Sequence, residues 1–382
     1  MTQLYGKIIE SNNTTGNKPF LLKLTSNNSL PVNYRKNVGL LNCKIDMNLS
    51  GYRAYISTNK NFLSNLPNSY LLEPFLDYLH DGDIIRLNPE QNQVRVLYRK
   101  QSPYNALLVT ERCNSFCLMC SQPPRKIDDD YIVDDLLVLI PMIDRGALEI
   151  GITGGEPTII GERFFEIIRK LKAYHPETSV HVLSNGRNFD DLLFAKKLRE
   201  INHPNLMLGI PLYSDISQIH DFVVQADGAF DQTIRGILNL KRCGIRVEIR
   251  FVVHKQTYDR MPQFAEFVVR NLTFVDQVVF MGLEITGFTK ANLDELWIDP
   301  VTYQPELAEA VFTLDRFHIK TSIYNHQLCT LDSRLNKFSV RSISDWKNIY
   351  MPECDPCMRK HECGGFFNSS IIRYSKHITP FN

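Results

Sequence analysis

The sequence has almost no excess charge of either sign, because 43 lysines and arginines balance 42 aspartates and glutamates for a formal net charge of +1. It contains no long basic run, so nothing in it attracts a nucleic-acid backbone over a distance. No apolar stretch approaches the length that a membrane span requires. We therefore expect neither a nucleic-acid partner nor a membrane partner.

A secretion signal is also missing, since residues 1–7 show no charged segment leading into an apolar core. From this we expect a cytoplasmic protein. Its 43% hydrophobic and 22% charged residues are ordinary for a soluble globular chain. A length of 382 residues leaves room for one barrel-sized domain and one or two smaller ones.

Cysteine, by contrast, is plentiful and clustered. There are nine cysteines, and six of them form two groups: Cys113, Cys117 and Cys120, then Cys354, Cys357 and Cys363. An odd count, close spacing and no export signal favour metal ligands over disulfides. Cys43 and Cys243 stand alone, and we expect each to be a small buried hydrophobic residue.

The first group follows an apolar run over residues 106–110 that predicts a short buried strand. Its spacing is CxxxCxxC. Iron–sulfur clusters are held by cysteine thiolates, and a four-iron cube takes one ligand per iron. Three ligands in one loop leave one iron open for chemistry, as a catalytic metal site requires. A zinc knuckle or three unrelated thiols are the alternatives that the spacing alone leaves open.

The second motif is Gly154-Gly155-Glu156-Pro157, which follows a predicted strand over 148–153. Small residues permit a tight turn here and let a ligand approach the backbone. The Glu156 carboxylate could then accept a hydrogen bond from an ammonium group. Alone, this motif would be an ordinary strand-to-helix turn. Its position on the strand after the cysteine loop makes a joint site the better interpretation.

From residue 106 to about 282 the pattern alternates strand and helix. Helical apolar stripes occur at Phe164, Ile168 and Leu171, and at Phe230, Ile234, Ile237 and Leu238. The predicted strands are 106–110, 148–153, 179–184, 206–213, 246–253 and 275–281. Six such units predict an α/β fold with a parallel sheet and right-handed crossovers. In barrels of this kind ligands collect at the C-terminal strand ends.

CxxxCxxC followed by GGE resembles the radical S-adenosylmethionine (SAM) enzymes. The resemblance implies a partial six-stranded (β/α) barrel over 101–282, a 4Fe–4S cluster and SAM bound at its open iron. It further implies that Gly154, Gly155 and Glu156 bind the SAM amino group. By position, Ser184 and Asn185 after the third strand and Ser214 after the fourth are further candidate SAM contacts. Glu248 and Arg250 alternate on the fifth strand and either point into the barrel or form an ion pair.

Residues 1–100 differ from the rest, with short β-rich runs at 7–10, 20–24, 52–56, 84–87 and 93–98 separated by Asn-, Gly- and Pro-rich turns. We expect a small β-rich domain with at most one or two helices. It carries no catalytic motif. It is either a structural appendage or a platform for a protein or peptide partner, and the sequence does not decide between them.

Residues 283–382 are predicted to begin with a connector that holds one more helix and strand. Cys329 follows it, and then comes the CxxCx5C group. Cys329, Cys354, Cys357 and Cys363 together supply four thiolates, enough to close one auxiliary 4Fe–4S cluster. A zinc site with the same ligands is the alternative. His361 could compete as a ligand, but we expect it to face solvent.

This C-terminal pattern resembles the SPASM and twitch extensions of peptide-modifying radical SAM enzymes. With four cysteines after the barrel, one cluster is the ceiling, as in twitch domains. Over residues 101–382 the chain is most similar to the radical SAM maturases of the His-Xaa-Ser system. The segments that carry this similarity are 110–125, Gly228-Ala229-Phe230-Asp231 with Gly236, Ser342-Ile343-Ser344-Asp345-Trp346-Lys347, and Cys363-Gly364-Gly365-Phe366-Phe367.

The resemblance implies a precursor peptide with His-Xaa-Ser repeats, a second radical SAM maturase and a flavodoxin- or ferredoxin-type electron donor as partners. One departure from the superfamily is Met119, where an aromatic residue commonly precedes the third cysteine; this puts the adenine contact there in question. The first functional hypothesis is thus a peptide maturase. The alternatives are a radical SAM enzyme that acts on a small molecule or RNA, and a non-catalytic metal-binding scaffold.

Overall fold

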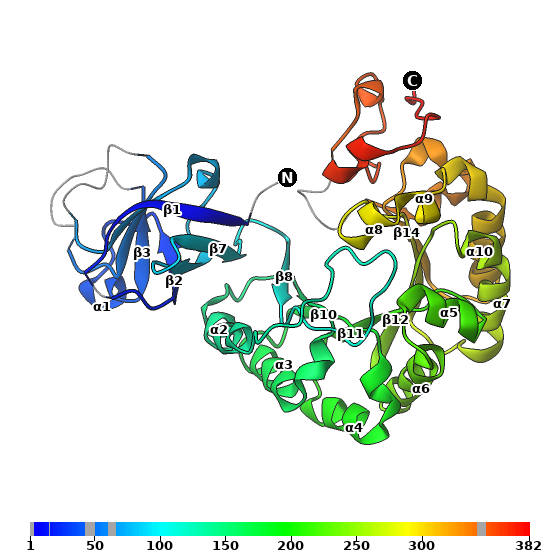
Figure 1. Ribbon diagram of the computed structural model, residues 1–382, viewed down its shortest axis with the longest axis horizontal. Helices are drawn as coiled ribbons and strands as arrows, with labels where there is room; N and C mark the ends of the chain where they lie inside the picture. Colours follow the sequence, from blue (N-terminus) through cyan, green and yellow to red (C-terminus); the bar gives the residue numbers. More distant parts are fainter. Residues whose placement is uncertain (1–3, 15, 43–49, 60–65, 342–348) are drawn as a thin grey trace. The chain divides into compact units, whose positions relative to one another are not determined.

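The computed structural model describes residues 4–14, 16–42, 50–59, 66–341 and 349–382. Cys43 and the segment Ser342–Lys347 lie outside these residues. The chain divides into two compact units (Figure 1). The first comprises residues 1–107, 131–150 and 170–178, and the second comprises 108–130, 151–169 and 179–382.

The first unit contains a closed barrel with the strand order β1-β5-β4-β3-β2-β6-β7. The strands are β1 (Tyr5–Asn12), β2 (Phe20–Thr25), β3 (Val38–Leu41), β4 (Ala54–Ser57), β5 (Ser69–Leu72), β6 (Ile84–Asn88) and β7 (Gln93–Tyr98). Two short helical segments, α1 (Val32–Arg35) and the 3-10 turn Pro74–Leu76, interrupt them. The β-rich character expected from the sequence is present, and β3 and β5 are strands that the sequence did not indicate.

The barrel closes because β1 pairs antiparallel with both β5 and β7. Along β7 the buried side chains of Val94, Val96 and Tyr98 alternate with half-buried ones, so one face of the strand forms the core. Closure removes free strand edges, so the described strands offer no edge for a partner strand to extend.

The second sheet has eight strands in the order β15-β14-β13-β12-β11-β10-β9-β8. They are β8 (Tyr104–Leu108), β9 (Glu149–Thr153), β10 (Ser179–Leu183), β11 (Leu206–Pro211), β12 (Arg246–Val252), β13 (Gln277–Met281), β14 (Thr321–Tyr324) and β15 (Ser339–Val340). Each of the six predicted strands is present. The pairs from β10 to β15 are parallel. Two further strands, β14 and β15, extend the sheet from the C-terminal hundred residues.

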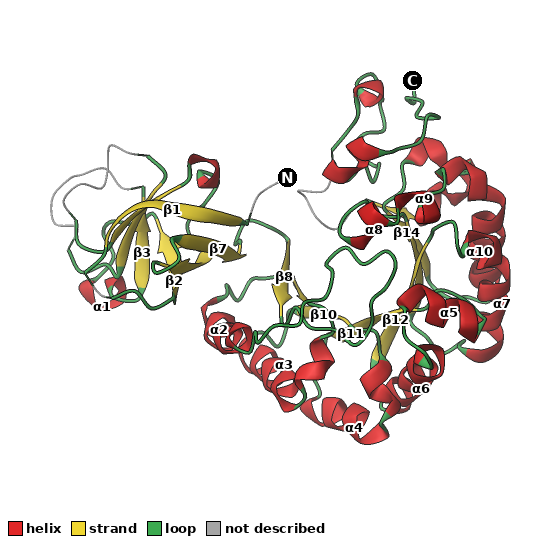
Figure 2. Cartoon of the chain, viewed as in Figure 1, coloured by secondary structure: helices red, strands yellow, loops and turns green. Residues whose placement is uncertain are grey.

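Helices connect these strands: α2 (Tyr131–Leu139), α3 (Glu162–Tyr174), α4 (Leu192–Ile201), α5 (Ser217–Val224), α6 (Ala229–Arg242), α7 (Met261–Asn271), α8 (Phe288–Ala291), α9 (Leu293–Leu296) and α10 (Gln304–Arg316). Figures 1 and 2 show α4, α6, α7 and α10 along the outer side of the strands. On β12, Val247, Ile249 and Phe251 are fully buried on one face, while Glu248 and Arg250 share the other.

The predicted stripe of α3 is buried in full, since Phe164, Ile168 and Leu171 have no exposed surface. The stripe of α6 was wrong at one position, because Leu238 is 43% exposed and Leu240 is buried instead. Gly236 explains the rotation: a Cβ there would lie 2.1 Å from the carbonyl oxygen of Gly186, so the helix face with the glycine lies against that turn. Within the described ranges, no helix is both long and apolar enough to cross a membrane.

Candidate functional site

The cysteine loop begins where β8 ends, and a buried carboxylate fixes its first turn. Asp129 has no exposed surface and accepts hydrogen bonds from Thr110 Oγ1 at 2.9 Å and from the Glu111 backbone N–H. It also forms an ion pair with Arg112 Nε at 2.9 Å. The backbone just before Cys113 is therefore held in one conformation. The sequence showed no signal for Asp129, because the contact joins residues 19 positions apart.

Further along, the loop lies against two helical segments. The N–H groups of Phe116 and Leu118 donate to the carbonyl groups of Val224 and Val223 at the end of α5. On the other side, Thr289 Oγ1 in α8 donates to the Met119 carbonyl group at 3.0 Å. These bonds satisfy backbone groups of the loop, so the loop is preorganised before any metal binds.

The two glycines of the second motif allow this loop to lie directly on the end of β9. A Cβ on Gly155 would lie 2.1 Å from the carbonyl oxygen of Arg112, and one on Gly154 would lie 2.6 Å from that of Thr110. Both distances are far below van der Waals contact. The glycines also line the cavity described below. They are thus required for packing as well as for access to the backbone.

Glu156 is fully buried, and its carboxylate joins two segments of the chain. Oε1 accepts hydrogen bonds from the Thr158 N–H and hydroxyl groups and from Ser184 Oγ, while Oε2 accepts one from the Asn185 N–H at 2.6 Å. Burial raises the pKa of Glu156, and these donors oppose that shift. The sequence placed this carboxylate on a SAM ammonium group. The structure gives it these protein donors as partners, and Glu156 is not among the residues that line the cavity.

Ser184 and Asn185, which the sequence selected at the end of β10, do line the cavity. Asn185 Nδ2 also donates to Asn114 Oδ1 at 2.6 Å and so contacts the cysteine loop. Arg187 reinforces this link, because its Nη1 donates to the Asn114 carbonyl group at 2.6 Å and to Ser115 Oγ at 3.0 Å. Arg187 was not found from the sequence, since its partners are more than 70 residues away.

All three thiols of the first group line one cavity of about 290 Å³ at the C-terminal ends of the strands. Burial raises the pKa of Cys113 to about 11 and that of Cys117 to about 12. A cation is needed to hold such buried thiols as thiolates, and a metal centre supplies one. The walls are completed by Thr153, Leu183, Gly209, Pro211, Tyr213, Val252, Met281, Leu283, Glu284 and Asn325.

The donor set fits an iron–sulfur cluster. Within the described residues, no three histidine, cysteine, aspartate or glutamate side chains converge as ligands of a single metal ion do. Three thiols that line one cavity fit such a cluster, because in a four-iron cube each thiolate binds its own iron. The glycine turn and the Ser184–Asn185 segment lie on the same cavity and leave backbone and side-chain polar groups for a second ligand.

Arg250 on β12 places a cation at the cavity. The sequence left open whether Glu248 and Arg250 point into the barrel or form an ion pair. Arg250 lines the cavity, and its Nε lies 3.3 Å from Oε1 of the buried Glu248. Both options therefore hold, because the pair is an ion pair and also faces inward. His181 Nε2 lies 3.6 Å from the same carboxylate oxygen, and burial with two nearby arginines lowers the pKa of His181 to about 3.

Gly209 makes room for this group. A Cβ there would lie 2.9 Å from His181 Nε2 and 3.0 Å from Arg250 Cδ.

Of the two residues Tyr213 and Ser214 after β11, one lines the cavity and the other does not. Tyr213 and Met119 both line the cavity and pack together in one buried cluster. Ser214 is fully buried, and its hydroxyl accepts a hydrogen bond from the Ile216 N–H and donates to Asp215. The structure does not bring the Ser214 side chain to the cavity wall, although its neighbour in sequence is there.

The four C-terminal cysteines, Cys329, Cys354, Cys357 and Cys363, line a second pocket together with Tyr350, Arg359, Lys360 and Phe381. Backbone N–H groups point at two of the sulfurs: Leu328 and Gly365 donate to Cys363 Sγ at 3.5 Å, and Phe381 donates to Cys357 Sγ at 3.4 Å. Such bonds stabilise thiolate charge at metal centres. Residue 329 and the 354–363 loop are thus brought to one place.

The other metal-capable residues are placed as the sequence predicted. His361 is exposed, does not line the second pocket, and lies beside Glu362. Cys243 is buried at the end of α6 and 7% exposed. Each described cysteine is free of disulfides.

Part of this chain matches a known family model. Residues 107–268 match the family model of the radical SAM superfamily. Fe-coproporphyrin III synthase of Methanosarcina barkeri is 29% identical over 183 residues, which cover 47% of this chain and 43% of the relative. GTP 3′,8-cyclase of Helicobacter pylori is 24% identical over 213 residues, covering 54% of this chain and 64% of the relative. The chain thus spans about half the length of these curated relatives.

Solved structures show the same kind of fold. The structure of anSMEcpe with bound AdoMet and the Kp18Cys peptide superposes with a TM-score of 0.50 at 16% identity, covering 72% of this chain and 92% of that chain. Streptococcus suis SuiB bound to precursor peptide SuiA has a TM-score of 0.49 at 17% identity, covering 62% and 52%. At such identities the likeness concerns the fold alone.

Proposed function

We propose that this chain is a radical SAM enzyme that cleaves SAM reductively and modifies a peptide or protein, since residues 107–268 match the radical SAM superfamily model and the curated relatives are enzymes. The observation that carries the proposal is one cavity lined by three thiols, a glycine turn and Arg250. When bound there, a 4Fe–4S cluster supplies the electron that cleaves SAM to methionine and a 5′-deoxyadenosyl radical. The scaffold hypothesis is not retained, because the curated relatives are enzymes.

The residues of this chain have distinct tasks in the proposal. Cys113, Cys117 and Cys120 hold the cluster. Gly154 and Gly155 present their backbone to the SAM ammonium group, while Glu156 keeps the turn and the Ser184–Asn185 segment in place through its four hydrogen bonds.

Arg250 offers donors to a carboxylate in the cavity, since its guanidinium has five N–H groups and Glu248 occupies only one side of it. Tyr213 and Met119 close the apolar wall and limit the entry of water.

Two further parts of the proposal concern the C-terminal residues. Cys329, Cys354, Cys357 and Cys363 would ligate one auxiliary 4Fe–4S cluster, because all four line one pocket and backbone N–H groups donate to the sulfurs of Cys357 and Cys363. With four protein ligands such a cluster has no open iron. Its role would be electron transfer and fixation of the C-terminus, in the partial-barrel-plus-extension arrangement of peptide-modifying relatives.

The substrate assignment rests on the resemblance to the His-Xaa-Ser maturases and is consistent with a fold neighbour that is solved with a peptide. The partners in this proposal are a precursor with His-Xaa-Ser repeats, a second radical SAM maturase and a flavodoxin- or ferredoxin-type electron donor. The alternative, a small-molecule substrate, is favoured by the names of the curated relatives, which act on GTP or a coproporphyrin.

Co-expression with a His-Xaa-Ser precursor and the second maturase tests the proposal. Anaerobic purification should give a brown protein, reduction with SAM should release 5′-deoxyadenosine, and mass spectrometry should find a changed precursor mass. The matched control is Cys117→Ala, which should leave the precursor unmodified. If the wild-type chain releases 5′-deoxyadenosine while the precursor keeps its mass in every combination, the peptide assignment is wrong and the small-molecule alternative stands.

A further inference from the structure

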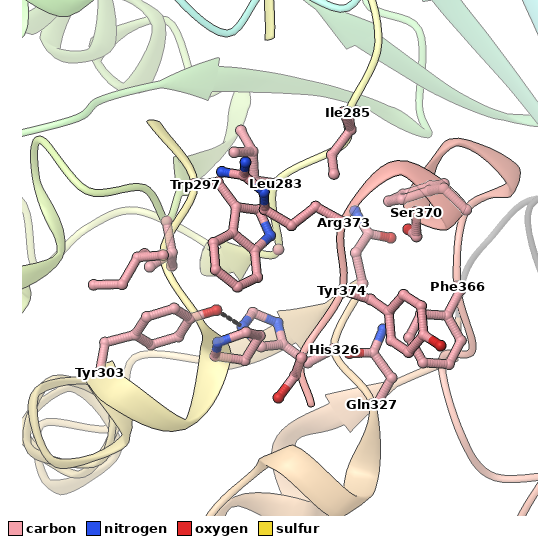
Figure 3. Close-up of a pocket in the computed structure, with 17 residues that line it drawn as sticks. Leu283, Ile285, Trp297, Tyr303, His326, Gln327, Phe366, Ser370, Arg373 and Tyr374 are labelled. Atoms are coloured by element: carbon pink, nitrogen blue, oxygen red, sulfur yellow. Dashed lines mark hydrogen bonds between the residues drawn. The ribbon is translucent and has the colours of Figure 1, made fainter. Parts of the chain in front are cut away.

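Another cavity, here called the second cavity and distinct from the pocket of the four C-terminal cysteines, adjoins the cavity that the three thiols line. Gly282, Leu283 and Asn325 line both. The second cavity has about 50 Å³ of space, and Figure 3 shows its walls, in which Trp297, Tyr303 and Phe366 present aromatic rings. A group bound here would lie next to whatever occupies the first cavity.

The same cavity also borders the pocket of the four C-terminal cysteines. Gln327 lines both, and its Nε2 donates to the Gly365 carbonyl group at 2.7 Å. Residues 325–329 therefore run past three cavities in succession, from Asn325 at the first to Cys329 at the last. This position, between the two groups of thiols, is where a substrate of a two-cluster enzyme would be held.

The hydrogen bond between Tyr303 and His326 in this cavity has a defined direction. His326 Nδ1 lies 2.9 Å from the Tyr324 carbonyl oxygen, which only accepts, so Nδ1 carries the proton. In a neutral ring Nε2 is then an acceptor, and Tyr303 Oη at 2.8 Å donates to it (Figure 3). Burial lowers the pKa of His326 to about 4, which keeps the ring neutral at physiological pH. Tyr303 has thus used its only proton and offers lone pairs alone to a ligand.

Size and charge narrow the ligand further. The cavity has about 50 Å³ of space, so its ligand is a small group. The one cation on the wall, Arg373, lies over the Trp297 ring and forms an ion pair with Asp294 at 2.9 Å. The cavity therefore suits a neutral, flat, small group that donates a hydrogen bond.

At the boundary between the two cavities, Asn325 provides a second contact. Its carboxamide makes no hydrogen bond to any described residue, and its backbone has a φ of 61°. A carboxamide offers one acceptor and an NH₂ donor side by side, which matches the N–H and C=O groups of a peptide backbone. A peptide that crosses this boundary could pair with it.

From these observations we propose that the second cavity binds the imidazole ring of a histidine in the peptide substrate, with a ring N–H donating to Tyr303 Oη and Asn325 binding the adjacent backbone amide. The inference rests on the proposed peptide-modifying function and adds a specificity site to it. The residue that reacts would be a near neighbour of this histidine, held in the first cavity.

The test uses the reconstituted full-length enzyme saturated with SAM, which occupies the open iron. Calorimetry compares N-acetyl-histidine N′-methylamide with the same compound carrying a thienyl ring, which has similar size but no N–H donor. Because the thienyl compound cannot donate this hydrogen bond, the wild-type enzyme should bind it about two- to tenfold more weakly than the histidine compound. In Tyr303→Phe the two ligands should bind equally, whereas Tyr374→Phe, whose hydroxyl donates to Glu353 instead, should keep the preference for histidine.

A second variant protects the test against misfolding of Tyr303→Phe. Asn325→Gly tolerates the positive φ and should weaken both ligands by a similar factor while the preference for the imidazole ring remains. Equal affinity of the two ligands in the wild-type enzyme, or a preference that survives in Tyr303→Phe, overturns the proposal.

Failure of the proposed function has a different signature. In that case the ring preference and its dependence on Tyr303 persist, but no precursor changes mass. A modified precursor combined with no ring preference would instead sink the cavity assignment alone.

Discussion

Ser184 Oγ donates a hydrogen bond to Oε1 of Glu156 at 2.9 Å and thereby joins the C-terminal ends of β10 and β9. Because the same carboxylate accepts the Asn185 N–H group and two donors of Thr158, one buried side chain sets the position of both segments that face SAM in our proposal. We therefore propose that Glu156 is a positioning residue, whereas its motif predicts a direct SAM contact.

Replacement of Glu156 by alanine should weaken SAM binding by about tenfold to a hundredfold, because the four hydrogen bonds that hold the glycine turn and the Ser184–Asn185 segment in place are lost. Equilibrium dialysis with SAM measures the affinity. Ser184→Ala separates the two roles, since a positioning carboxylate predicts a smaller loss of affinity there too. Unchanged SAM affinity in Ser184→Ala, with a large loss in Glu156→Ala, would restore the direct contact.

Gly155→Ala should disrupt the cysteine loop. Its Cβ would lie 2.1 Å from the Arg112 carbonyl oxygen, and relief of such a clash costs about 1–3 kcal/mol and moves the backbone. We expect a lower iron content and little 5′-deoxyadenosine. Gly146→Ala is the control, because its Cβ would meet only the flexible Asp144 carboxylate at 3.1 Å. Normal iron content in Gly155→Ala would contradict this packing argument.

Cys117→Ala should abolish 5′-deoxyadenosine formation, because a three-thiolate site cannot lose one ligand and still leave a single open iron. The C-terminal cluster should survive, so iron analysis should fall by about one cluster while a visible absorption band remains. Full SAM cleavage in this variant would refute the assignment of the first cysteine group.

Cys329→Ala tests whether the four C-terminal cysteines ligate one cluster. If Cys329 is the fourth ligand, the variant should lose the auxiliary cluster, keep SAM cleavage and fail to modify the precursor. Iron content and electron paramagnetic resonance measure the clusters, and mass spectrometry measures the product. Cys243→Ala serves as the control, since this buried thiol lies at the end of α6 and lines neither pocket. Retention of two clusters and of product in Cys329→Ala would make Cys329 a bystander.

Acid should destabilise the fold through buried histidines. Burial lowers the pKa of His254 to about 3 and that of His220 to about 4, so both stay neutral in the native state. Unfolded histidine binds a proton below about pH 6.5, so the stabilisation is complete above that pH and is lost as the pH falls toward 4. The free energy of unfolding should drop by about 1.4 kcal/mol per pH unit for each such histidine.

Urea unfolding at pH 7 and 5.5 measures this slope. His254→Asn should reduce it by the share of one histidine, whereas His361→Gln on the exposed loop should leave it unchanged. An unaltered slope in His254→Asn would disprove the assignment.

Much of the fold was predictable because its signals are local. The six strands from β8 to β13 and the stripe of α3 follow from apolar spacing within single segments. The strands β3 and β5 escaped notice because their burial depends on barrel closure. Leu238 was misassigned because Gly236, which carries no hydrophobic signal, decides which face of α6 packs.

The sequence by itself determined which thiols can share a metal site: CxxxCxxC lies within eight residues, CxxCx5C within ten, and each spacing alone brings its thiols together. Only the tertiary structure decided what surrounds them. Arg187 reaches Asn114 across 73 positions, and Tyr303 meets His326 across 23. Two partners of Glu156, Ser184 and Asn185, directly follow β10, and Asn325 lines two cavities at once. Such contacts join residues from separate segments of the chain. No spacing along one segment can encode them, because the distances between these residues are set by how the strands pair in the sheet.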